Sequence, residues 1–424
     1  MNDMANAMST QEQLACLILD EVAALTRDGE GITRESYGKG EELAMQAIEN
    51  YAQTMGLIAE RDAVQNLWLR LPEDKRDAPA VVIGSHLDSV PQGGNFDGLA
   101  GVVAGMLVLD RLRDDIESAP PVRVLALRGE ESAWYGKAYT GSLALLGQLP
   151  ASALQLRHRS GTGTLGEALA ACGADVDAIE RGKAAVDPKR IAAYLELHIE
   201  QGPVMITRGW PTAIVTGIRG NMRHNRVTCI GETGHSGAVP RWLRKDAVLA
   251  VAELLSRMDE HWRVLLQMGM DLVMTTGICT TPANSHAVSV IPGEVQFSFE
   301  VRSQDKDTLE RFYQLMQDEC SAIARERGVS FEFDQRLYSA PATMDAGWIK
   351  AFEEAASVSG ASAVHIPSGA GHDAAVFANA GIPSGMVFIR NANGSHNVHE
   401  AMDTADMMQG VELLIGALQG RGAP

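Results

Sequence analysis

Residues 80–98 have the sequence AVVIGSHLDSVPQGGNFDG. The first seven residues are a short apolar run, which is typical of a strand buried on both faces of a sheet. A helical pattern follows over residues 96–113, and two more apolar runs come later, VRVLAL at 122–127 and AYLELH at 193–198. Apolar strands that alternate with helices predict a mostly parallel α/β sheet.

The middle of the chain has a different pattern, with alternating strands and two long amphipathic helices. We predict strands over residues 213–218, 226–230, 272–279 and 288–302, and helices over 246–258 and 307–327. From residue 347 the alternation of helix and strand returns. The predicted fold class is therefore α/β: a larger domain, residues 1–212 and 331–424, with a smaller α+β domain, residues 213–330, inserted into it.

The composition is that of a globular protein with an acidic surface. The 424 residues include 36 Lys and Arg and 54 Asp and Glu, which gives a net charge of −18. Such a polyanion is a poor binder of nucleic acid and of anionic membranes, because both require clustered cations. The longest apolar run, residues 100–109, is far short of the roughly 20 residues that span a bilayer. We therefore expect no nucleic acid and no membrane among the partners.

Cysteine usage indicates a reducing compartment. The five cysteines are odd in number and form no CxxC motif, so a disulfide framework is not expected. The stretch MNDMANAMSTQEQ lacks the cationic and then apolar order of a signal peptide. Together these features predict a cytoplasmic protein.

Candidate metal ligands occur where the predicted strands end. They are His86, Asp97, Glu130, Glu131, His198 and His396. Taken singly, a histidine at a strand end is usually a hydrogen-bonded structural residue, and adjacent glutamates are usually solvated. Together at one edge of a sheet they indicate a metal site, since imidazole and carboxylate ligands suit Zn, Mn, Co or Ni. A carboxylate such as Asp97 can bridge two ions, and Asp88 is placed to accept a hydrogen bond from His86 and fix its tautomer.

The motifs that contain these residues carry a family resemblance. The segment GSHLDSVPQGGNFDGLAGV, residues 84–102, resembles the first metal motif of the dinuclear-zinc amidohydrolases related to aminoacylase and carboxypeptidase. Within that group, LELHIEQGPV, SGAGHDAAVFA and SHNVHE resemble the N-carbamoyl-L-amino-acid hydrolase branch, which includes β-ureidopropionase and allantoate amidohydrolase. The resemblance extends from about residue 84 to residue 414, with the motifs in the expected order.

The resemblance implies a role for each candidate ligand. One metal ion would be held by His86, Asp97 and His198, and a second by Asp97, Glu131 and His396. Glu130 would be the general base. The implied cofactors are two divalent ions per subunit, zinc first, with Mn, Co or Ni as alternatives.

The inserted domain would supply substrate-binding residues. GETGHSGAVPRWLRKDA resembles the HAG motif of the family, which implies that His235 stabilises the oxyanion, in some members from the neighbouring subunit, and hence a homodimer. FEVR resembles the segment whose arginine, here Arg302, binds the substrate α-carboxylate in a bidentate manner. Further candidates for substrate binding are Gln201, Arg223, Ser289 and His372.

Several positions depart from the family pattern and leave the substrate open. Ser289 replaces a usual asparagine, Trp134 an arginine, Arg241 a methionine and Asn221 a glutamine. The predicted activity is hydrolysis of a C–N bond in an N-carbamoyl or ureido amino acid, a small amide with a carboxylate. One alternative is an aminoacylase or dipeptidase with the same site. Another is a non-catalytic relative that binds small molecules, although every position expected for a ligand or base is intact.

Overall fold

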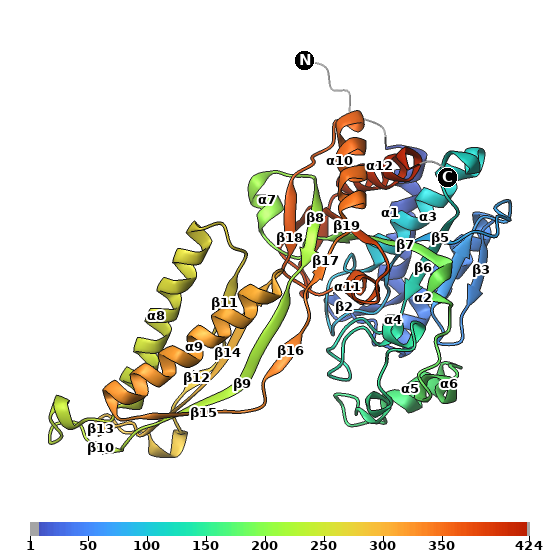
Figure 1. Cartoon of the computed structure of the whole chain (residues 1–424). Coiled ribbons are helices and arrows are strands. Elements are labelled where there is room, and N and C mark those ends of the chain that lie inside the picture. Colours follow the sequence, from blue (N-terminus) through green and yellow to red (C-terminus); the bar gives the residue numbers. More distant parts are fainter. Residues whose placement is uncertain (1–7, 422–424) are drawn as a thin grey trace. The chain divides into compact units, whose positions relative to one another are not determined.

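The structure, a computed structural model, describes residues 8–421. The chain divides into two compact units (Figure 1). Unit 1 contains the residues up to Thr216 and from Thr343 onward, and unit 2 is Gly217–Ala342. The mixed α/β class predicted from the sequence is confirmed.

Unit 1 is built on a nine-stranded sheet with the order β17-β8-β19-β7-β5-β6-β4-β3, in which β18 also pairs with β8. The central strands β19, β7, β5 and β6 are parallel, whereas β8 and β4 join them antiparallel. The bounds are β3 (Ile58–Arg61), β4 (Leu67–Arg70), β5 (Ala80–His86), β6 (Val122–Leu127), β7 (Ile191–Ile199), β8 (Thr212–Ile218), β17 (Ala342–Thr343), β18 (His365–Ser368) and β19 (Ser384–Ile389).

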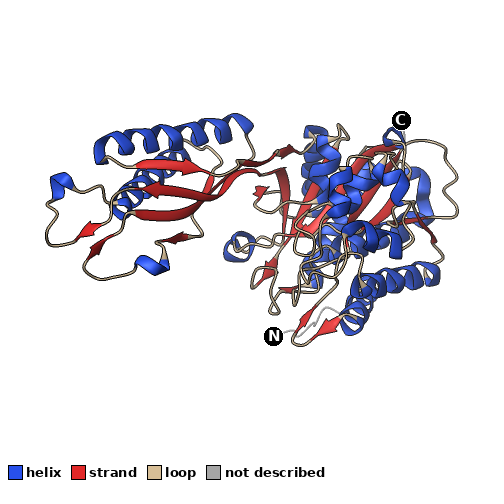
Figure 2. Cartoon of the chain, turned by 90° about the horizontal axis from the view of Figure 1, so that it is seen from below, coloured by secondary structure: helices blue, strands red, loops and turns tan. Residues whose placement is uncertain are grey.

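Helices cover both faces of this sheet (Figure 2). One face shares a single apolar core with α1 (Thr10–Leu25), α2 (Lys39–Thr54), α3 (Leu99–Leu112), α10 (Ala346–Ser359) and α12 (Thr404–Gly420). On the other face the ring of Phe377, in α11 (Asp373–Asn379), stacks on Tyr194 of β7 at 3.9 Å. The shorter elements are α4 (Thr140–Leu145), α5 (Leu165–Ala171), α6 (Val176–Glu180), α7 (Val204–Arg208), β1 (Arg27–Asp28), β2 (Gly31–Ile32), β20 (Asn391–Ala392) and β21 (Ala401–Met402).

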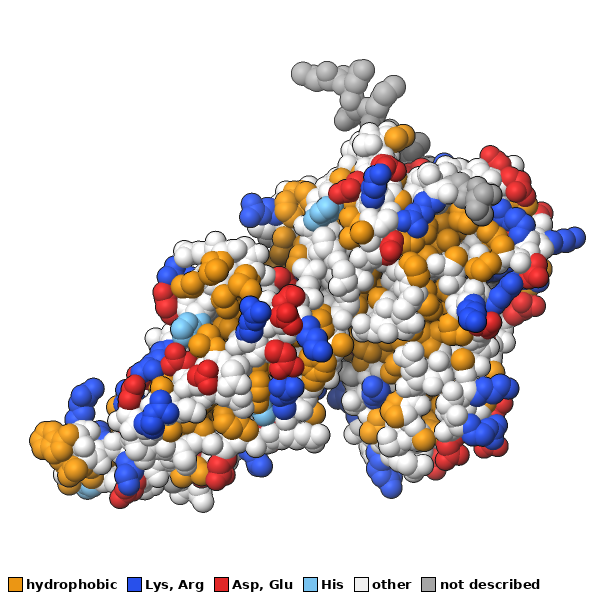
Figure 3. All heavy atoms as spheres, in the orientation of Figure 1, with side chains coloured by type: hydrophobic (Ala, Val, Ile, Leu, Met, Phe, Trp, Pro, Cys, Tyr) orange, Lys and Arg blue, Asp and Glu red, His pale blue; other side chains and the backbone are white. Residues whose placement is uncertain are grey.

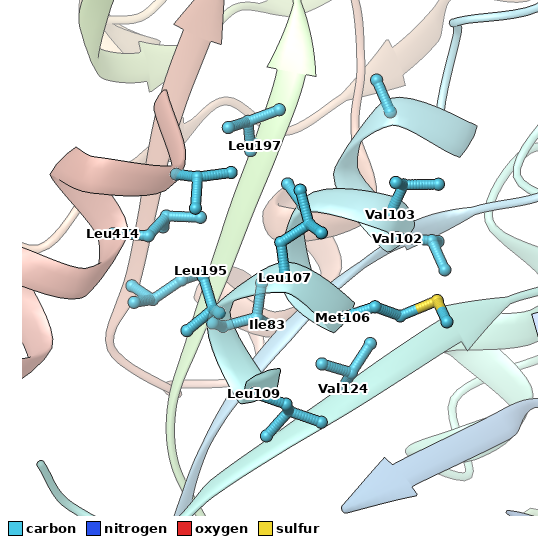
Figure 4. Close-up of a cluster of buried hydrophobic side chains, with 14 of the residues drawn as sticks. Ile83, Val102, Val103, Met106, Leu107, Leu109, Val124, Leu195, Leu197 and Leu414 are labelled. Atoms are coloured by element: carbon cyan, nitrogen blue, oxygen red, sulfur yellow. The ribbon is translucent and has the colours of Figure 1, made fainter. Parts of the chain in front are cut away.

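Helix α3 is apolar almost all round because it lies inside this core. Figure 4 shows its residues Met106, Leu107 and Leu109 in one cluster with Ile83, Val124 and Leu195 of the sheet. The helix also approaches the sheet closely at Gly101, where a Cβ would lie 2.2 Å from the backbone oxygen of Leu197. This close packing fixes the loop that precedes α3 against the carboxyl ends of β5 and β7.

Unit 2 is a six-stranded antiparallel sheet with two helices on one face. Its longest strands, β9 (Gly220–Ile230) and β14 (Glu294–Ser303), pair along their length. The alternate residues of β14 are buried, including Phe297 and Phe299, and they pack with α8 (Ala247–Gln267) and α9 (Lys306–Arg327). The remaining strands are β11 (Val273–Thr275), β12 (Cys279–Thr280), β15 (Ser330–Phe333), β16 (Leu337–Ser339) and the separate pair β10 (Gly234–His235) and β13 (Val290–Ile291).

The compact inserted unit ends at Ala342, twelve residues beyond the boundary expected from the sequence. The reason is pairing, because β15 and β16 both add to β9 and so belong to the unit 2 sheet. Helix α8 is also longer than expected and continues to Gln267.

No helix among residues 8–421 combines the length and the apolar composition needed to cross a membrane. Acidic and basic side chains intermingle over the face shown in Figure 3.

Candidate metal centre

The candidate ligands of unit 1 meet because three neighbouring strands run parallel. His86 is the last residue of β5, His198 lies near the end of β7, and Glu131 follows β6. These strands are adjacent in the order β7-β5-β6, so their carboxyl ends lie side by side. Asp97 precedes α3, and His396 lies in the loop between β20 and β21.

A first group of ligand atoms surrounds one oxygen of Asp97. The Nε2 atoms of His86 and His198 lie 3.4 and 3.2 Å from Asp97 Oδ1, and 3.5 Å from each other. All three side chains are buried. Asp97 Oδ1 has no hydrogen-bond partner.

A second group surrounds the other oxygen of Asp97. His396 Nε2 lies 3.4 Å from Asp97 Oδ2 and 3.3 Å from Glu131 Oε1. The His396 side chain is half exposed, and its backbone φ of 60° is left-handed, a conformation that non-glycine residues adopt mainly at functional sites and turns. Asp97 therefore belongs to both groups and links them.

The ring tautomers put the lone pair on the nitrogen atoms that would bind a metal, although His198 Nε2 accepts the backbone N–H of Gly98 at 3.2 Å. His86 Nδ1 lies 3.0 Å from the backbone oxygen of Asp88, and His198 Nδ1 lies 2.9 Å from that of Ile199. A ring N–H that donates to a carbonyl puts the lone pair on Nε2, the atom that faces Asp97.

The spacing of these atoms fits divalent metal ions better than direct hydrogen bonding. Two ligands at about 2.0–2.1 Å from a tetrahedral ion are about 3.3 Å apart, as simple trigonometry requires. The three separations within the first group, and the two that His396 makes in the second, are 3.2–3.5 Å. The buried, unpartnered Oδ1 of Asp97 would gain a partner from such an ion, since polar atoms without partners are costly inside proteins.

Asp88 makes more contacts in the structure than the one with His86 that its position in the sequence predicts. Its carboxylate lies 3.4 Å from His86 Nδ1, whereas the backbone oxygen of Asp88 lies only 3.0 Å from that atom. The backbone carbonyl of Asp88 is therefore the main hydrogen-bond partner of the His86 ring. The two carboxylate oxygens instead accept the backbone N–H groups of Glu130 and Glu131, at 3.0 and 3.1 Å. The hydroxyl of Ser36 also donates to Asp88, at 2.5 Å. Burial would raise the pKa of Asp88, but these contacts and His86 hold it below its usual value.

Glu130 lies within the same cluster, buried beside the candidate ligands. Burial raises its pKa well above the usual range, and although His86 opposes this, the neighbouring carboxylates Glu131, Asp373 and Asp88 raise it further. Asp97 behaves in the opposite way, because contacts from the three histidines outweigh burial and keep its pKa well below the usual value. A carboxyl with a raised pKa is suited to exchange a proton.

The loop that carries Asp97 is held by residues that the sequence analysis missed. Glu400 Oε1 accepts the N–H groups of Phe96 and Asp97, at 2.8 and 3.2 Å. Arg34 is fully buried and donates to carbonyl groups in the same region. The next residue after Asp97 is Gly98, whose φ is +70° and where a Cβ would meet the His86 backbone oxygen at 2.4 Å. Glu400 lies in the SHNVHE motif, whereas nothing in the sequence distinguished Arg34.

Gln201 and His372 also lie beside the candidate ligands. Gln201 has a φ of 61°, and its Nε2 donates to Asp97 Oδ2 at 2.7 Å. His372 precedes α11, and its ring lies 4.4 Å from that of His198. His372, His198 and Glu196 form a third group of atoms close enough to hold a metal ion.

The remaining candidates belong to unit 2, in two places. Arg302 and Arg223 lie on the sheet face away from the helices, where Arg302 Nη2 donates to Glu300 Oε1 at 3.1 Å. His235 pairs with Val290 on the β10–β13 ribbon, and the neighbouring Ser236 N donates to the backbone oxygen of Ser289 at 2.9 Å.

Candidate metal ligands at the carboxyl edge of an α/β sheet, together with an inserted α+β unit, are features of a class of metal-dependent hydrolases. Residues 82–420 match the family described as peptidase family M20/M25/M40. The chain belongs to this family, and the resemblance inferred from its motifs is confirmed.

Relatives and solved structures agree with this assignment. The chain is 33% identical over 386 residues to an N-carbamoyl-L-amino acid amidohydrolase of Geobacillus stearothermophilus, covering 91% of this chain and 92% of the relative. It is 31% identical over 389 residues to the allantoate amidohydrolase of Escherichia coli, covering 91% of each. A hydantoinase/carbamoylase family amidase from Burkholderia ambifaria is similar in structure, with a TM-score of 0.84, 30% identity and coverage of 97% and 98%. The chain is a hydrolase that acts on carbon–nitrogen bonds.

Proposed function

We propose that this chain is a metal-dependent amidohydrolase that cleaves a C–N bond in an N-carbamoyl or ureido amino acid. The observation that carries the metal-dependent part is the spacing of the ligand atoms around Asp97, 3.2–3.5 Å in two groups that share this residue. The substrate class is supported by similar relatives named as N-carbamoyl-L-amino acid and allantoate amidohydrolases.

In this proposal two divalent ions bind per subunit, zinc first, with Mn, Co or Ni as alternatives. One is held by His86, Asp97 and His198, and the other by Asp97, Glu131 and His396. When bound, such a pair of ions lowers the pKa of a water molecule and polarises the scissile carbonyl group.

The protein side chains would then manage the protons. Glu130 accepts a proton from the attacking water and donates it to the leaving nitrogen, which is a general-base and then a general-acid role. Asp88 acts on the backbone of Glu130 and Glu131, because its carboxylate accepts their N–H groups and so fixes where the two side chains begin.

Substrate recognition is assigned by the chemistry of the side chains. Arg302 would bind the substrate carboxylate through its planar guanidinium, and His235 would stabilise the oxyanion. Gln201, whose buried Oε1 has no hydrogen-bond partner, would accept a donor from the substrate. Lesser contacts would come from Arg223, Ser289 and His372.

Two broader features complete the proposal. The inserted unit serves as a lid and dimerisation domain, and the enzyme is a homodimer. It works in the cytoplasm, because free thiols suit a reducing compartment. The cysteines that are free thiols in the structure are Cys16, Cys172, Cys229, Cys279 and Cys320.

The test is metal analysis of the purified protein followed by a substrate panel. We expect two equivalents of a divalent metal per chain, and release of ammonia and carbon dioxide from N-carbamoyl or ureido amino acids. Hydrolysis of N-acyl amino acids or dipeptides without ammonia would instead indicate an aminoacylase or dipeptidase. Metal binding without turnover on any of these amides would indicate a non-catalytic relative.

A further inference from the structure

Arg34 is a fully buried cation close to the candidate metal centre. It lies between β2 and α2, and its side chain has no solvent exposure. Burying a guanidinium is costly unless its donors are bonded and its charge is balanced. Its contacts therefore indicate what the residue does.

The side chain binds both ends of the single loop that connects β5 to α3, residues 87–98. On one side Nε donates to the backbone oxygen of Leu87 at 2.6 Å, directly after His86. On the other side Nη1 donates to Asn95 Oδ1 at 3.0 Å and Nη2 to the Asn95 backbone oxygen at 3.1 Å. Nη2 also lies 3.4 Å from the backbone oxygen of Asp97. One guanidinium thus joins the start of this loop, next to His86, to its end, which carries Asp97.

The backbone of Arg34 adds to the same connection. Its N–H donates to the hydroxyl of Ser89 at 2.9 Å, and its carbonyl accepts the Ser89 N–H at 2.8 Å. The segment that contains Arg34 is therefore itself bonded to the loop after His86.

The hydrogen bonds of this guanidinium go to uncharged oxygens, so its charge is balanced through space. The carboxylates of Glu400, Asp97, Asp88 and Glu131 provide that balance and oppose the effect of burial on the pKa of Arg34. The guanidinium therefore lies near these four carboxylates without a hydrogen bond to any of them, so their oxygens stay available to a metal ion.

We propose that Arg34 is a positioning residue of the metal centre, which holds His86 and Asp97 at the spacing that a metal ion requires. This inference rests on the proposed function. It makes a selective prediction: the ion bound by His86, Asp97 and His198 depends on Arg34 more than the ion bound by Asp97, Glu131 and His396. Two ligands of the first ion, His86 and Asp97, lie at the ends of this loop, whereas the second ion has only Asp97 there.

The test is Zn²⁺ binding to the metal-free full-length chain, measured by competition with a chromogenic chelator. Arg34→Lys keeps the charge and loses the planar fork, because an ammonium cannot bond the carbonyl groups at both ends of the loop in this geometry. We expect Zn²⁺ affinity at one of the two sites to fall by about 10- to 100-fold, the usual effect of losing a residue that orients metal ligands. With Co²⁺ as the probe, the d–d absorption of that site should also change, which a purely structural role would not produce.

Arg61→Lys is the matched control. Arg61 also makes several hydrogen bonds, to Glu49 and Glu42, and it lies on β3 away from the ligand loops. We expect it to lower thermal stability and to leave Zn²⁺ affinity and the Co²⁺ spectrum unchanged. If both variants lose affinity equally, or if Arg34→Lys binds both ions as the parent does, the proposal is overturned.

A second variant decides the matter if Arg34→Lys does not fold. Asn95→Ala removes the acceptor of Nη1 and leaves the guanidinium in place, so it should weaken the same site by a smaller factor. Unchanged Zn²⁺ binding in a folded Asn95→Ala protein would then overturn the role of Arg34. A parent protein that binds no Zn²⁺ would overturn the proposed metal centre itself. A parent protein that binds Zn²⁺, with variants that bind it equally well, would overturn only the role of Arg34.

Discussion

The carboxylate of Asp88 lies 3.0 Å from the backbone nitrogen of Glu130 and accepts its N–H. The second oxygen of Asp88 accepts the N–H of the next residue, Glu131, at 3.1 Å. A side chain just beyond the end of β5 thereby fixes the peptide units that follow the end of β6. The candidate base and a candidate ligand are adjacent in sequence, and this single carboxylate sets the direction of both.

Replacing Asp88 by asparagine should therefore lower turnover while the fold is retained. An amide nitrogen cannot accept an N–H, so one of the two peptide donors loses its partner. We expect kcat to fall by about 10- to 100-fold. The matched control is Asp62→Asn, since Asp62 also accepts backbone N–H groups, from Val64 and Asn66, but lies in the turn before β4. Equal kcat values for the two variants would contradict the role of Asp88.

Substitutions of Glu130 and of Glu131 should affect catalysis and metal binding separately. Glu130→Gln should keep both metal equivalents and lower kcat by about 10²–10⁴-fold, because a general base is lost and no ligand is. Glu131→Gln should lower metal content, because a neutral amide is a poorer ligand. Metal analysis and kinetics of the two proteins, prepared in parallel, check this. Near-parental turnover of Glu130→Gln would remove Glu130 from the mechanism.

Asp97→Ala should abolish metal binding and activity together. One carboxylate belongs to both ligand groups, so its loss removes a ligand from each. His396→Ala is the comparison, because His396 belongs to one group and should leave the other ion bound. Two metal equivalents in dialysed Asp97→Ala protein, measured by atomic emission, would show that Asp97 does not bridge.

Arg302→Lys tests recognition of the substrate carboxylate. Lysine keeps the charge but cannot bind a carboxylate in a bidentate manner, so kcat/KM should fall for a substrate with a free carboxylate. The fall should be small for the corresponding amide or ester, and this difference separates the contact from general destabilisation. If Arg302 is only a surface residue of β14, the variant should have parental kinetics on both substrates, since surface substitutions change stability by less than about 0.5 kcal/mol.

Much of unit 1 was predictable because its central strands are continuous apolar runs. The segments 80–86 and 122–127 form strands with the predicted bounds. The first ends at His86, and the second ends three residues before Glu130. The carboxyl ends of parallel strands necessarily share an edge, so a sequence pattern was enough to expect His86, His198 and Glu131 together.

Other features could not be predicted because they depend on the path of loops or on distant pairing. Arg34 binds backbone carbonyls, and any residue has those, so no motif marks its partners. The end of unit 2 was misplaced because β15 and β16 are short, partly exposed strands whose partner, β9, lies about a hundred residues earlier. The sequence predicted a hydrogen bond between the Asp88 side chain and His86. Its hydrogen bonds with the backbone of Glu130 and Glu131 could be predicted only by knowing that β5 and β6 are neighbours.

The chain leaves unit 1 through β8 and returns through β17, and these two strands are neighbours at the edge of the sheet. The N–H of Met344 even donates to the backbone oxygen of Thr216, at 3.2 Å. A gene segment could therefore be gained, lost or exchanged between these two points without changing the order or register of the strands that carry the candidate ligands. The inserted unit is thus the part of the chain that could be exchanged as one piece, while the strands that carry the candidate ligands remain in place.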